Sequence, residues 1–383
     1  MRVLVLNAGS SSLKASVIDT ASNATLAESI TGWQLDASAA DSRREAATSV
    51  VADVTSRTGA IHAVGHRVVH GGSAFTGPTR VTDDVLELIE ALDELAPLHN
   101  HLAVETVQAA TSLLPNIDHV ACFDTAFHSV LEEEAWRYPL PRDWQARWGI
   151  RRFGFHGLSV SWAVERAGQL LGRPVADLNL VVAHLGSGSS VTAVRGGRSV
   201  ATSMGFTPLE GLMMGTRSGS VDPGILLHVL RNGMTADELA DALEHNSGLL
   251  AVSGRTADVA ELERAASDGK DNAALSLGIY IRRAAEGIAA AATSLKRLDA
   301  FVFTGGIGEH ADSVRSAICV RLLVLGIRPP RPSAGDEDEV LSSPGSGVHV
   351  IRIRSREDVV IARQTAQLLE VDNSARRAPE STS

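Results

Sequence analysis

Two segments of the chain follow one plan, in which a short apolar strand, a bend of small residues and a second apolar strand come in succession. The first is VLVLNAGSSSLKASVID, residues 3–19, and the second is LNLVVAHLGSGSSVTAVRGG, residues 178–197. An ordinary hairpin turns on two residues such as Asn-Gly, so these longer bends need another explanation. Because the plan occurs twice, we predict a duplicated α/β unit.

The length of the chain agrees with duplication. At 383 residues, of which 44% are hydrophobic, it exceeds the size at which a single hydrophobic core usually divides. Strand-like runs alternate with helical ones, as illustrated by a strand at 119–128 that breaks at Asp124 and an alanine-rich helix at 276–298. We therefore predict two α/β domains.

The overall charge and the N-terminal residues exclude several classes of protein. The formal net charge is −10, and no basic cluster suits nucleic acid or an anionic membrane. No uncharged apolar run approaches the ~20 residues of a membrane helix, and the N-terminus lacks the pattern of a secretion signal. Cys122 and Cys319 stand apart in apolar surroundings and predict buried thiols. We expect a cytoplasmic protein that binds neither nucleic acid nor membranes.

The first Gly/Ser bend suits an anion. Backbone N–H groups are exposed at glycine and serine, and several that point one way form a cradle for phosphate, to which a lysine adds charge. Ser10, Ser12 and Lys14 are therefore candidate phosphate ligands, although a solvated hairpin tip explains this stretch alone equally well. The sequence contains no P-loop motif.

Two further bends of small residues follow strands later in the sequence. They consist of His184, Gly186, Ser187, Gly188 and Ser189, and of Gly305, Gly306 and Gly308. Each bend is weak evidence alone. Three of them at strand ends form the pattern of a nucleotide held between two domains.

Four polar residues stand beside apolar neighbours. Arg67 and Arg217 each precede a glycine-containing turn, and an arginine in apolar surroundings suits carboxylate or phosphoryl oxygens. Asp124 ends an apolar strand, where a carboxylate needs a partner or a function. The commoner alternatives stay open: a lone arginine usually lies on the surface, and a lone histidine such as His156 is usually a satisfied core residue.

At this point the motifs are specific enough to indicate a family. The chain carries, in the order and spacing of acetate kinases, the motifs NAGSSSLK, GHRVVHGG, LAPLHN, FDTAFH, RRFGFHG, HLGSGSS, SMGFTPLEGLMMGTRSG and TGGIGE. From Val3 to about Leu369 it resembles the short-chain acyl kinases of the acetate/sugar kinase–heat-shock–actin superfamily.

The resemblance implies an α/β fold of two ribonuclease-H-like βββαβαβα domains with a cleft between them, the actin-like ATPase fold. It places an N-terminal acyl kinase domain at 1–148, joined by a C-terminal helix at about 360–372, and a C-terminal nucleotide-binding domain at 149–359. It also implies a homodimer. The tail 373–383 has few apolar residues, and we expect it to be disordered.

The activity implied by the resemblance is the reversible transfer of the ATP γ-phosphoryl group to acetate, which gives acetyl phosphate and ADP. The transfer would be direct and in-line and would depend on Mg2+, with Mn2+ as the alternative metal. An acetate oxygen is already a nucleophile at pH 7, so proton removal contributes little. Asp124 is therefore expected to organise the site rather than act as an essential base.

Carried over position by position, the resemblance assigns the site residues. The catalytic residues are Asp124, His156 and Arg217, and the metal would be held by Asn7 and Glu357. The acyl substrate would bind at Arg67, Val69, Leu98, Phe155 and Pro208. ATP would bind at Ser10, Ser12, Lys14, His184, Leu185, Gly186, Ser187, Gly188, Asp258, Gly306, Ile307, Gly308, Glu309 and His310.

The sequence departs from the family pattern mainly on the nucleotide side. The departures are Ser187 for the asparagine of HLGNG, Ser220 for the acid of RSGD, His310 for the last residue of GIGEN, Val160 for the second histidine of GFHGTSH, Ala260 for an arginine after SGRTAD, and SRED (355–358) for TNEE. The acyl side is intact. We therefore predict a higher KM for ATP than in a relative with the full motifs.

Two other functions remain open. A propionate or butyrate kinase would use the same residues, and one methylene in an apolar pocket discriminates by only about 1–3 kcal/mol, so we expect acetate first and propionate second. A weakly active nucleotide-binding regulator would explain the substituted bends. It would have little need, however, to keep Asn7, Arg67, Asp124, His156, Arg217 and Glu357.

Overall fold

The chain forms two units, each built on one six-stranded sheet. The computed structural model describes residues 1–9, 12–33, 40–93 and 100–377, without the side chains at 40, 41 and 373–377. The units are Met1–Ser129 with Arg356–Ser383, and Val130–Ser355. Residues 130–148, which the resemblance assigns to the N-terminal domain, pack with the second unit. The N–H of Arg152, for example, donates to the carbonyl of Trp136 at 2.8 Å.

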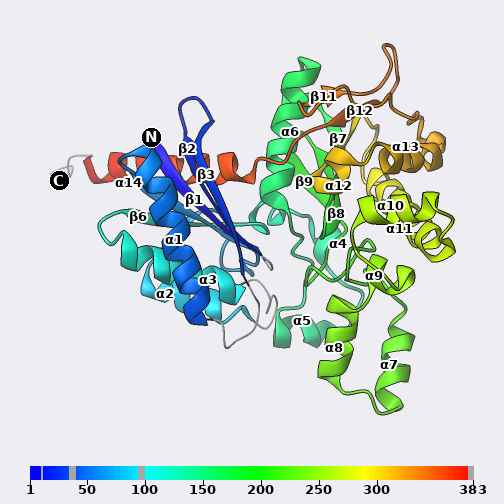
Figure 1. Ribbon diagram of the computed structural model, residues 1–383, viewed down its shortest axis with the longest axis horizontal. Helices are drawn as coiled ribbons and strands as arrows, with labels where there is room; N and C mark the ends of the chain where they lie inside the picture. The colour runs from blue at the N-terminus through cyan, green and yellow to red at the C-terminus, as the bar shows by residue number, and fades with distance from the viewer. Residues whose placement is uncertain (10–11, 34–39, 94–99, 378–383) are drawn as a thin grey trace. The chain divides into compact units, whose positions relative to one another are not determined.

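The first unit has the strand order β3-β2-β1-β4-β6-β5. Its strands are β1 (Arg2–Ala8), β2 (Ser12–Asp19), β3 (Ala24–Gly32), β4 (Ala63–Val68), β5 (Thr79–Arg80) and β6 (Asp118–Phe123), and its helices are α1 (Ala40–Thr58), α2 (Asp83–Glu90), α3 (Asn100–Leu113) and α14 (Glu357–Arg377). Val3, Leu4, Val5 and Leu6 are all buried. Both faces of β1 are therefore covered, and α14, drawn in red in Figure 1, contacts β1, β2, β4 and β6.

The second unit has the strand order β11-β12-β10-β7-β8-β9. Its strands are β7 (Asn179–Leu185), β8 (Ser189–Arg195), β9 (Arg198–Thr202), β10 (Ala300–Thr304), β11 (Glu339–Val340) and β12 (His349–Arg352). Its helices are α4 (Glu133–Trp136), α5 (Arg142–Trp148), α6 (Gly157–Leu171), α7 (Pro223–Arg231), α8 (Ala236–His245), α9 (Gly248–Ser253), α10 (Val259–Ser267), α11 (Asp271–Ala292), α12 (Gly305–His310) and α13 (Asp312–Arg321). The alanine-rich α11 packs against this sheet, where Tyr280 and Ile288 share a core with Phe301.

The two sheets have the same topology, which confirms the predicted duplication. In each, three antiparallel strands come first, β1–β3 and β7–β9, and the next strand pairs in parallel with the first of them. Then a further parallel strand is added, β6 beside β4 and β12 beside β10. The α/β prediction is confirmed.

The C-terminal helix differs from its predicted bounds. We expected a helix at about 360–372 followed by a disordered tail, whereas α14 begins at Glu357 and continues through Arg377. The first five residues of the predicted tail are therefore helical, and residues 378–383 lie outside the described part of the chain. The early start places Glu357 in the first turn of α14, where a carboxylate interacts favourably with the helix dipole.

Both cysteines are buried, as the sequence indicated, and burial raises the pKa of Cys122 and of Cys319 to about 12. These thiols stay protonated and unreactive at neutral pH. Of the helices in the described ranges, none combines the length and the apolarity that crossing a membrane requires.

A buried histidine pair in the first sheet makes the stability depend on pH. His66 Nε2 lies 2.9 Å from His119 Nδ1, and burial, followed by the proximity of His119, lowers the pKa of His66 well below its ordinary value. Below about pH 6.5 the unfolded chain binds a proton that the folded chain excludes. The stabilisation is therefore complete above that pH and is lost as the pH falls towards the lowered pKa of the folded state.

We expect the free energy of unfolding, measured with urea, to decrease between pH 7 and pH 5. His66→Leu should reduce that slope by up to about 1.4 kcal/mol per pH unit, the value for one proton. His228→Gln, which changes an exposed histidine of α7, is the control and should leave the slope unchanged. Equal slopes in the wild type and His66→Leu would contradict this account.

Candidate active site

Four side chains of the first unit meet at the carboxyl ends of its parallel strands. Asn7 is near the end of β1, Arg67 is in β4, Asp124 directly follows β6, and Glu357 begins α14. Since β4 lies between β1 and β6 in the sheet, the order of the strands places Arg67 between Asn7 and Asp124. Asp124, Arg67, Asn7 and Glu357, predicted respectively as a catalytic, an acyl-binding and two metal-associated residues, thus form one cluster.

Arg67 is the centre of this cluster. Its Nε and Nη2 donate to the two carboxylate oxygens of Asp124 at 3.1 and 2.5 Å, and its Nη1 donates to Asn7 Oδ1 at 3.1 Å. Glu357 Oε2 lies 3.7 Å from Arg67 Nε and accepts from Asn7 Nδ2 at 3.4 Å. Asp124 is fully buried. A buried carboxylate in a bidentate pair is held in one orientation.

The charges in the cluster favour a permanently protonated arginine. Burial alone lowers the pKa of Arg67, but the negative charges of Asp124 and Glu357 raise it above its ordinary value. A guanidinium has five N–H donors. Within the described residues, three of those of Arg67 bind Asp124 and Asn7, so two can bind a ligand.

The protein side chains of this cluster could supply only some of the ligands of a magnesium ion. In the described ranges no three His, Cys, Asp or Glu side chains come together as ligands. Mg2+, however, is usually held by one or two carboxylates with substrate phosphates and water. One arginine and two carboxylates leave one net negative charge, and the Glu357 carboxylate beside the Asn7 amide supplies oxygen donors of the right kind.

The first glycine bend is only partly described. Ser10 lies outside the described residues; in the remainder, Gly9 N donates to the carbonyl of Ser12 at 2.8 Å. Lys14 lies directly across from Asn7 in the β1–β2 ladder, on the same face of the sheet. Its ammonium, however, pairs with Glu28 on β3 at 2.9 Å, and both side chains are well exposed. This pair is weak in water and can exchange for a phosphate.

Two histidines of the second unit are stacked. The ring centroids of His156 and His184 are 4.1 Å apart, and each ring has a serine partner: His156 Nδ1 lies 2.9 Å from Ser190 Oγ, and His184 Nδ1 lies 2.8 Å from Ser159 Oγ. His156 precedes α6 with φ +58°, a left-handed conformation that is costly for histidine. Backbone strain at this position is typical of a functional residue.

The second and third glycine bends are neighbours in the second unit. Strands β7 and β10 are parallel partners with His184 opposite Thr304, so the residues after them meet at one edge of the sheet. Gly305 has φ +77°, and a Cβ there would lie 2.7 Å from the carbonyl oxygen of Leu185. Only glycine allows this approach. The predicted bend at Gly306–His310 is a short helix, α12, that begins directly after the strand.

Gly188 brings His156 and Arg217 together. A Cβ on Gly188 would lie 3.3 Å from His156 Nε2 and 3.8 Å from Arg217 Nη1. Arg217 Nη1 also donates to the carbonyl of Pro208 at 3.0 Å. The two residues predicted to stabilise the phosphoryl group thus lie beside one bend.

The predicted acyl-binding residues are divided between the units. Val69 is buried directly after β4, two residues beyond Arg67, Phe155 is buried and precedes His156 in the chain, and Pro208 is partly buried. Leu98 lies outside the described residues.

Several predicted ATP ligands have structural partners. Asp258 accepts from Glu261 N at 2.8 Å and caps α10, Glu309 accepts from Ser355 N at 2.9 Å, and the Leu185 side chain lies in the core. Only the backbone of Leu185 can therefore contact a ligand. Ile307 is packed against the same core, while Gly306 and His310 are exposed.

Sequence reasoning missed the two serines that hold the histidines, Ser159 and Ser190. Ser190 lies directly opposite His184 in the β7–β8 ladder, so the hairpin register could have indicated it. Ser159 also lies 3.2 Å from Ser355 Oγ, and no sequence pattern predicts that contact, because the two residues are far apart in the chain.

Known proteins resemble this chain over nearly its full length. The model of the "Acetokinase family" matches residues 34–363. An acetate kinase from Deinococcus radiodurans is 44% identical over 402 aligned residues, which cover 96% of this chain and 98% of the relative. An acetate kinase from a Geobacillus species is 38% identical, with 97% and 99% covered.

Two solved structures of acyl kinases also resemble this chain over nearly its full length. The propionate kinase from Francisella tularensis has a TM-score of 0.85 at 34% identity, and the Porphyromonas gingivalis acetate kinase has a TM-score of 0.83 at 33% identity; in both comparisons 96% of this chain and 99% of the other are covered. These matches confirm the expected actin-like ATPase fold. The chain belongs to the acetokinase family.

Proposed function

We propose that this protein is an acetate kinase, a phosphotransferase that moves the γ-phosphoryl group of ATP to acetate and, in reverse, from acetyl phosphate to ADP. The observation that carries the proposal is the cluster around Arg67, in which a guanidinium with two available donors lies between Asp124, Asn7 and Glu357. Family membership and the names of the relatives agree with it.

Arg67 would bind the carboxylate of acetate. Its remaining N–H donors match a planar carboxylate, and Val69, buried two residues further along the chain, suits a methyl group. Asp124 uses both oxygens to hold Arg67, which supports an orienting role. Acetate needs no base at pH 7, so this arrangement can position the attacking oxygen without proton transfer.

The second unit would bind ATP and neutralise the transferring group. Gly188 lies beside His156 and Arg217, and a Cβ on Gly186 would lie 3.8 Å from the backbone N of Gly306, so the two glycine bends are close to these cationic groups. Phosphoryl transfer is catalysed mainly by positioning and by positive charge. Glu357 and Asn7 would hold Mg2+, which when bound neutralises charge on phosphate oxygens.

Turnover of acetate with MgATP in a coupled ADP assay tests the function. We expect acetyl phosphate as the product, trapped as the hydroxamate. A wild type that binds ATP but turns over no carboxylic acid would contradict the proposal and favour the regulator.

Propionate kinase is the second candidate, because a relative with that name is among the close structural matches. Hydroxamate formation across acids of two to four carbons separates the two activities. We expect kcat/KM to be highest for acetate. A maximum at three or four carbons would replace acetate with the longer acid.

The substituted nucleotide positions lead to a further prediction. Ser187 and Ala260 are exposed, so larger side chains fit there without repacking the core. We expect Ser187→Asn with Ala260→Arg, which restores the family residues, to lower the KM for ATP several-fold and leave the KM for acetate unchanged. Initial-rate titrations of both substrates measure this. An unchanged KM for ATP would show that these substitutions do not weaken nucleotide binding.

We also propose that the enzyme works in the cytoplasm as a homodimer, in keeping with the family resemblance. Light scattering on the purified protein would give the mass of two chains of 40.3 kDa each. A monomeric mass at the concentration of the activity assay would exclude the dimer.

A further inference from the structure

Two segments of the second unit carry its predicted acyl and phosphoryl contacts. Residues 152–156 include Phe155 and His156, and the loop 203–220 includes Pro208 and Arg217. Their backbones are joined where the N–H groups of Phe153 and Gly154 both donate to the carbonyl of Gly205, at 3.0 and 3.3 Å. The position of one segment thus depends on the other.

Arg152 joins the same two segments through its side chain. Nη1 donates to the carbonyls of Ser203 and Met204 at 3.1 and 2.9 Å, and Nη2 donates to Glu210 Oε1 at 2.7 Å. The guanidinium therefore holds both ends of the turn 203–210, which contains Pro208. It is only 18% exposed, so solvent screens the ion pair with Glu210 only partly.

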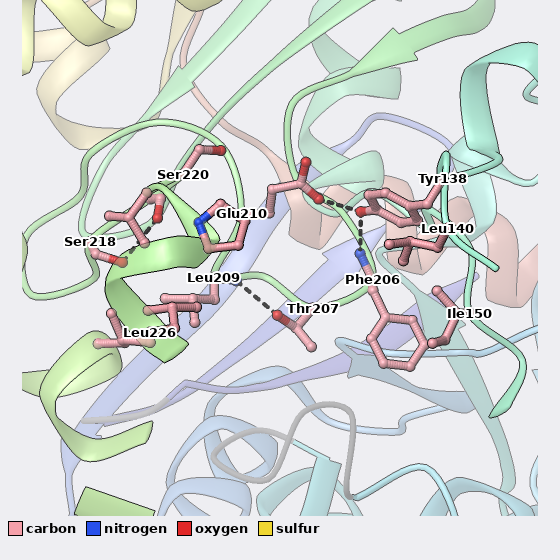
Figure 2. A pocket seen from close by; sticks show the side chains of 14 residues that line it. Tyr138, Leu140, Ile150, Phe206, Thr207, Leu209, Glu210, Ser218, Ser220 and Leu226 are labelled. Atoms are coloured by element: carbon pink, nitrogen blue, oxygen red, sulfur yellow. Dashed lines mark hydrogen bonds between the residues drawn. The ribbon is translucent and has the colours of Figure 1, made fainter. Parts of the chain in front are cut away.

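Tyr138 completes the contact from a third segment. As Figure 2 shows, its hydroxyl meets Glu210 Oε2 and also accepts from the N–H of Phe206, at 3.0 Å. The guanidinium of Arg152 lies 5.2 Å from the centre of the Tyr138 ring. Burial raises the pKa of Tyr138, so the hydroxyl keeps its proton and can donate to the carboxylate.

Close packing around this network leaves no space for a side chain at position 205. A Cβ on Gly205 would overlap Glu210 Oε2 and Tyr138 Oη. On another side, the turn faces a pocket of about 450 Å³, lined in part by Tyr138, Leu140, Phe206, Leu209, Glu210 and Leu226 (Figure 2). The turn lacks close packing on that side, so the polar contacts contribute a larger share of what holds it.

We propose that Tyr138, Arg152 and Glu210, here called the Tyr138 clamp, are positioning residues that set the selectivity for the acyl substrate. This inference rests on the proposed function. The clamp fixes the turn that carries Pro208. The carbonyl of Pro208 accepts a hydrogen bond from Arg217 Nη1 at 3.0 Å, so the clamp also bears on the position of Arg217. Small displacements of groups around a substrate are costly, and a shift of about 1 Å can lower the rate a hundredfold.

The test compares Tyr138→Phe and Glu210→Gln with the wild type, using acetate and propionate. Tyr138→Phe removes only the hydroxyl, and Glu210→Gln keeps the shape of the side chain but removes its charge. Glu133→Gln is the matched control, because Glu133 pairs only with Arg137 in the exposed helix α4 among the described contacts.

We expect each clamp variant to raise the KM for acetate about tenfold and to lower the acetate/propionate ratio of kcat/KM, because a loosened turn accepts the larger acid. The KM for ATP should stay unchanged. The double variant should show less than the product of the two single effects, because both act through one network. The control should match the wild type.

Three results would overturn the clamp: an unchanged acetate/propionate ratio in both variants, a loss that is equal for all substrates and follows the fraction of folded protein, or a ratio that shifts equally in the control. A wild type that phosphorylates neither acid would instead contradict the proposed function, and the proposed role of the clamp would then be excluded as well.

Discussion

Replacing Arg217 by alanine is expected to lower kcat by about a thousandfold while the protein remains folded. Arg217 Nη1 and His156 Nε2 both lie beside Gly188, so the variant removes the permanent charge of the pair and keeps only the imidazole. An arginine that stabilises a transferring phosphoryl group contributes about 10³–10⁵ in kcat. Steady-state kinetics in the acetyl phosphate direction and the acetate direction should show the same loss, because both directions share one transition state.

The control for this prediction is Arg282→Ala. Arg282 is 69% exposed on α11 and pairs with Glu286, so its removal should change neither kcat nor thermal unfolding. An Arg217→Ala variant with more than about a tenth of the wild-type kcat would exclude a direct role in the transition state.

Replacing Arg67 by leucine is expected to abolish turnover of acetate and to destabilise the first unit. Asp124 is fully buried, and without Arg67 its charge loses its bidentate partner. Removing one member of a buried ion pair typically costs about 3–5 kcal/mol. Urea unfolding followed by circular dichroism measures the stability, and the coupled assay measures turnover.

The double variant Arg67→Leu with Asp124→Asn separates the two effects. It removes the uncompensated charge, so it should recover most of the lost stability without recovering activity. If Arg67→Leu alone were as stable as the wild type, Arg67 and Asp124 would not be a coupled buried pair. Activity in the double variant would exclude Arg67 as the ligand of the substrate carboxylate.

The local pattern of the chain predicted much of the secondary structure. Small residues at the ends of apolar strands located the bend at Gly186–Gly188 and the end of β10 before Gly305, where the chain continues as α12, and the break at Asp124 coincides with the end of β6. Such features depend on a few neighbouring residues, which is why they can be predicted from the sequence. The bounds of α14 could not be predicted in the same way, because this helix packs on β1, β2, β4 and β6, which are far from it in the chain.

The partners of the charged residues could not be predicted from the sequence. The resemblance indicated that Arg67 and Asp124 both serve the acyl substrate, but not that both oxygens of Asp124 are taken up by Arg67. Lys14, expected at phosphate, pairs with Glu28 because the β2–β3 ladder brings the two strands together. Nothing in the motifs indicated Tyr138 as a partner of Glu210.

The sequence by itself determined the duplicated strand–bend–strand plan, the glycine positions and the family, because these depend on neighbouring residues and on motifs that keep their order along the chain. The tertiary structure alone decided which charges meet. Arg67 meets Asp124 because β4 and β6 are adjacent and parallel, and Arg152 meets Glu210 because the loop 203–220 returns to the segment before α6. The physical reason is that a charge is stabilised by whichever opposite charge or dipole the fold places within hydrogen-bond distance, and separation along the chain does not determine that distance.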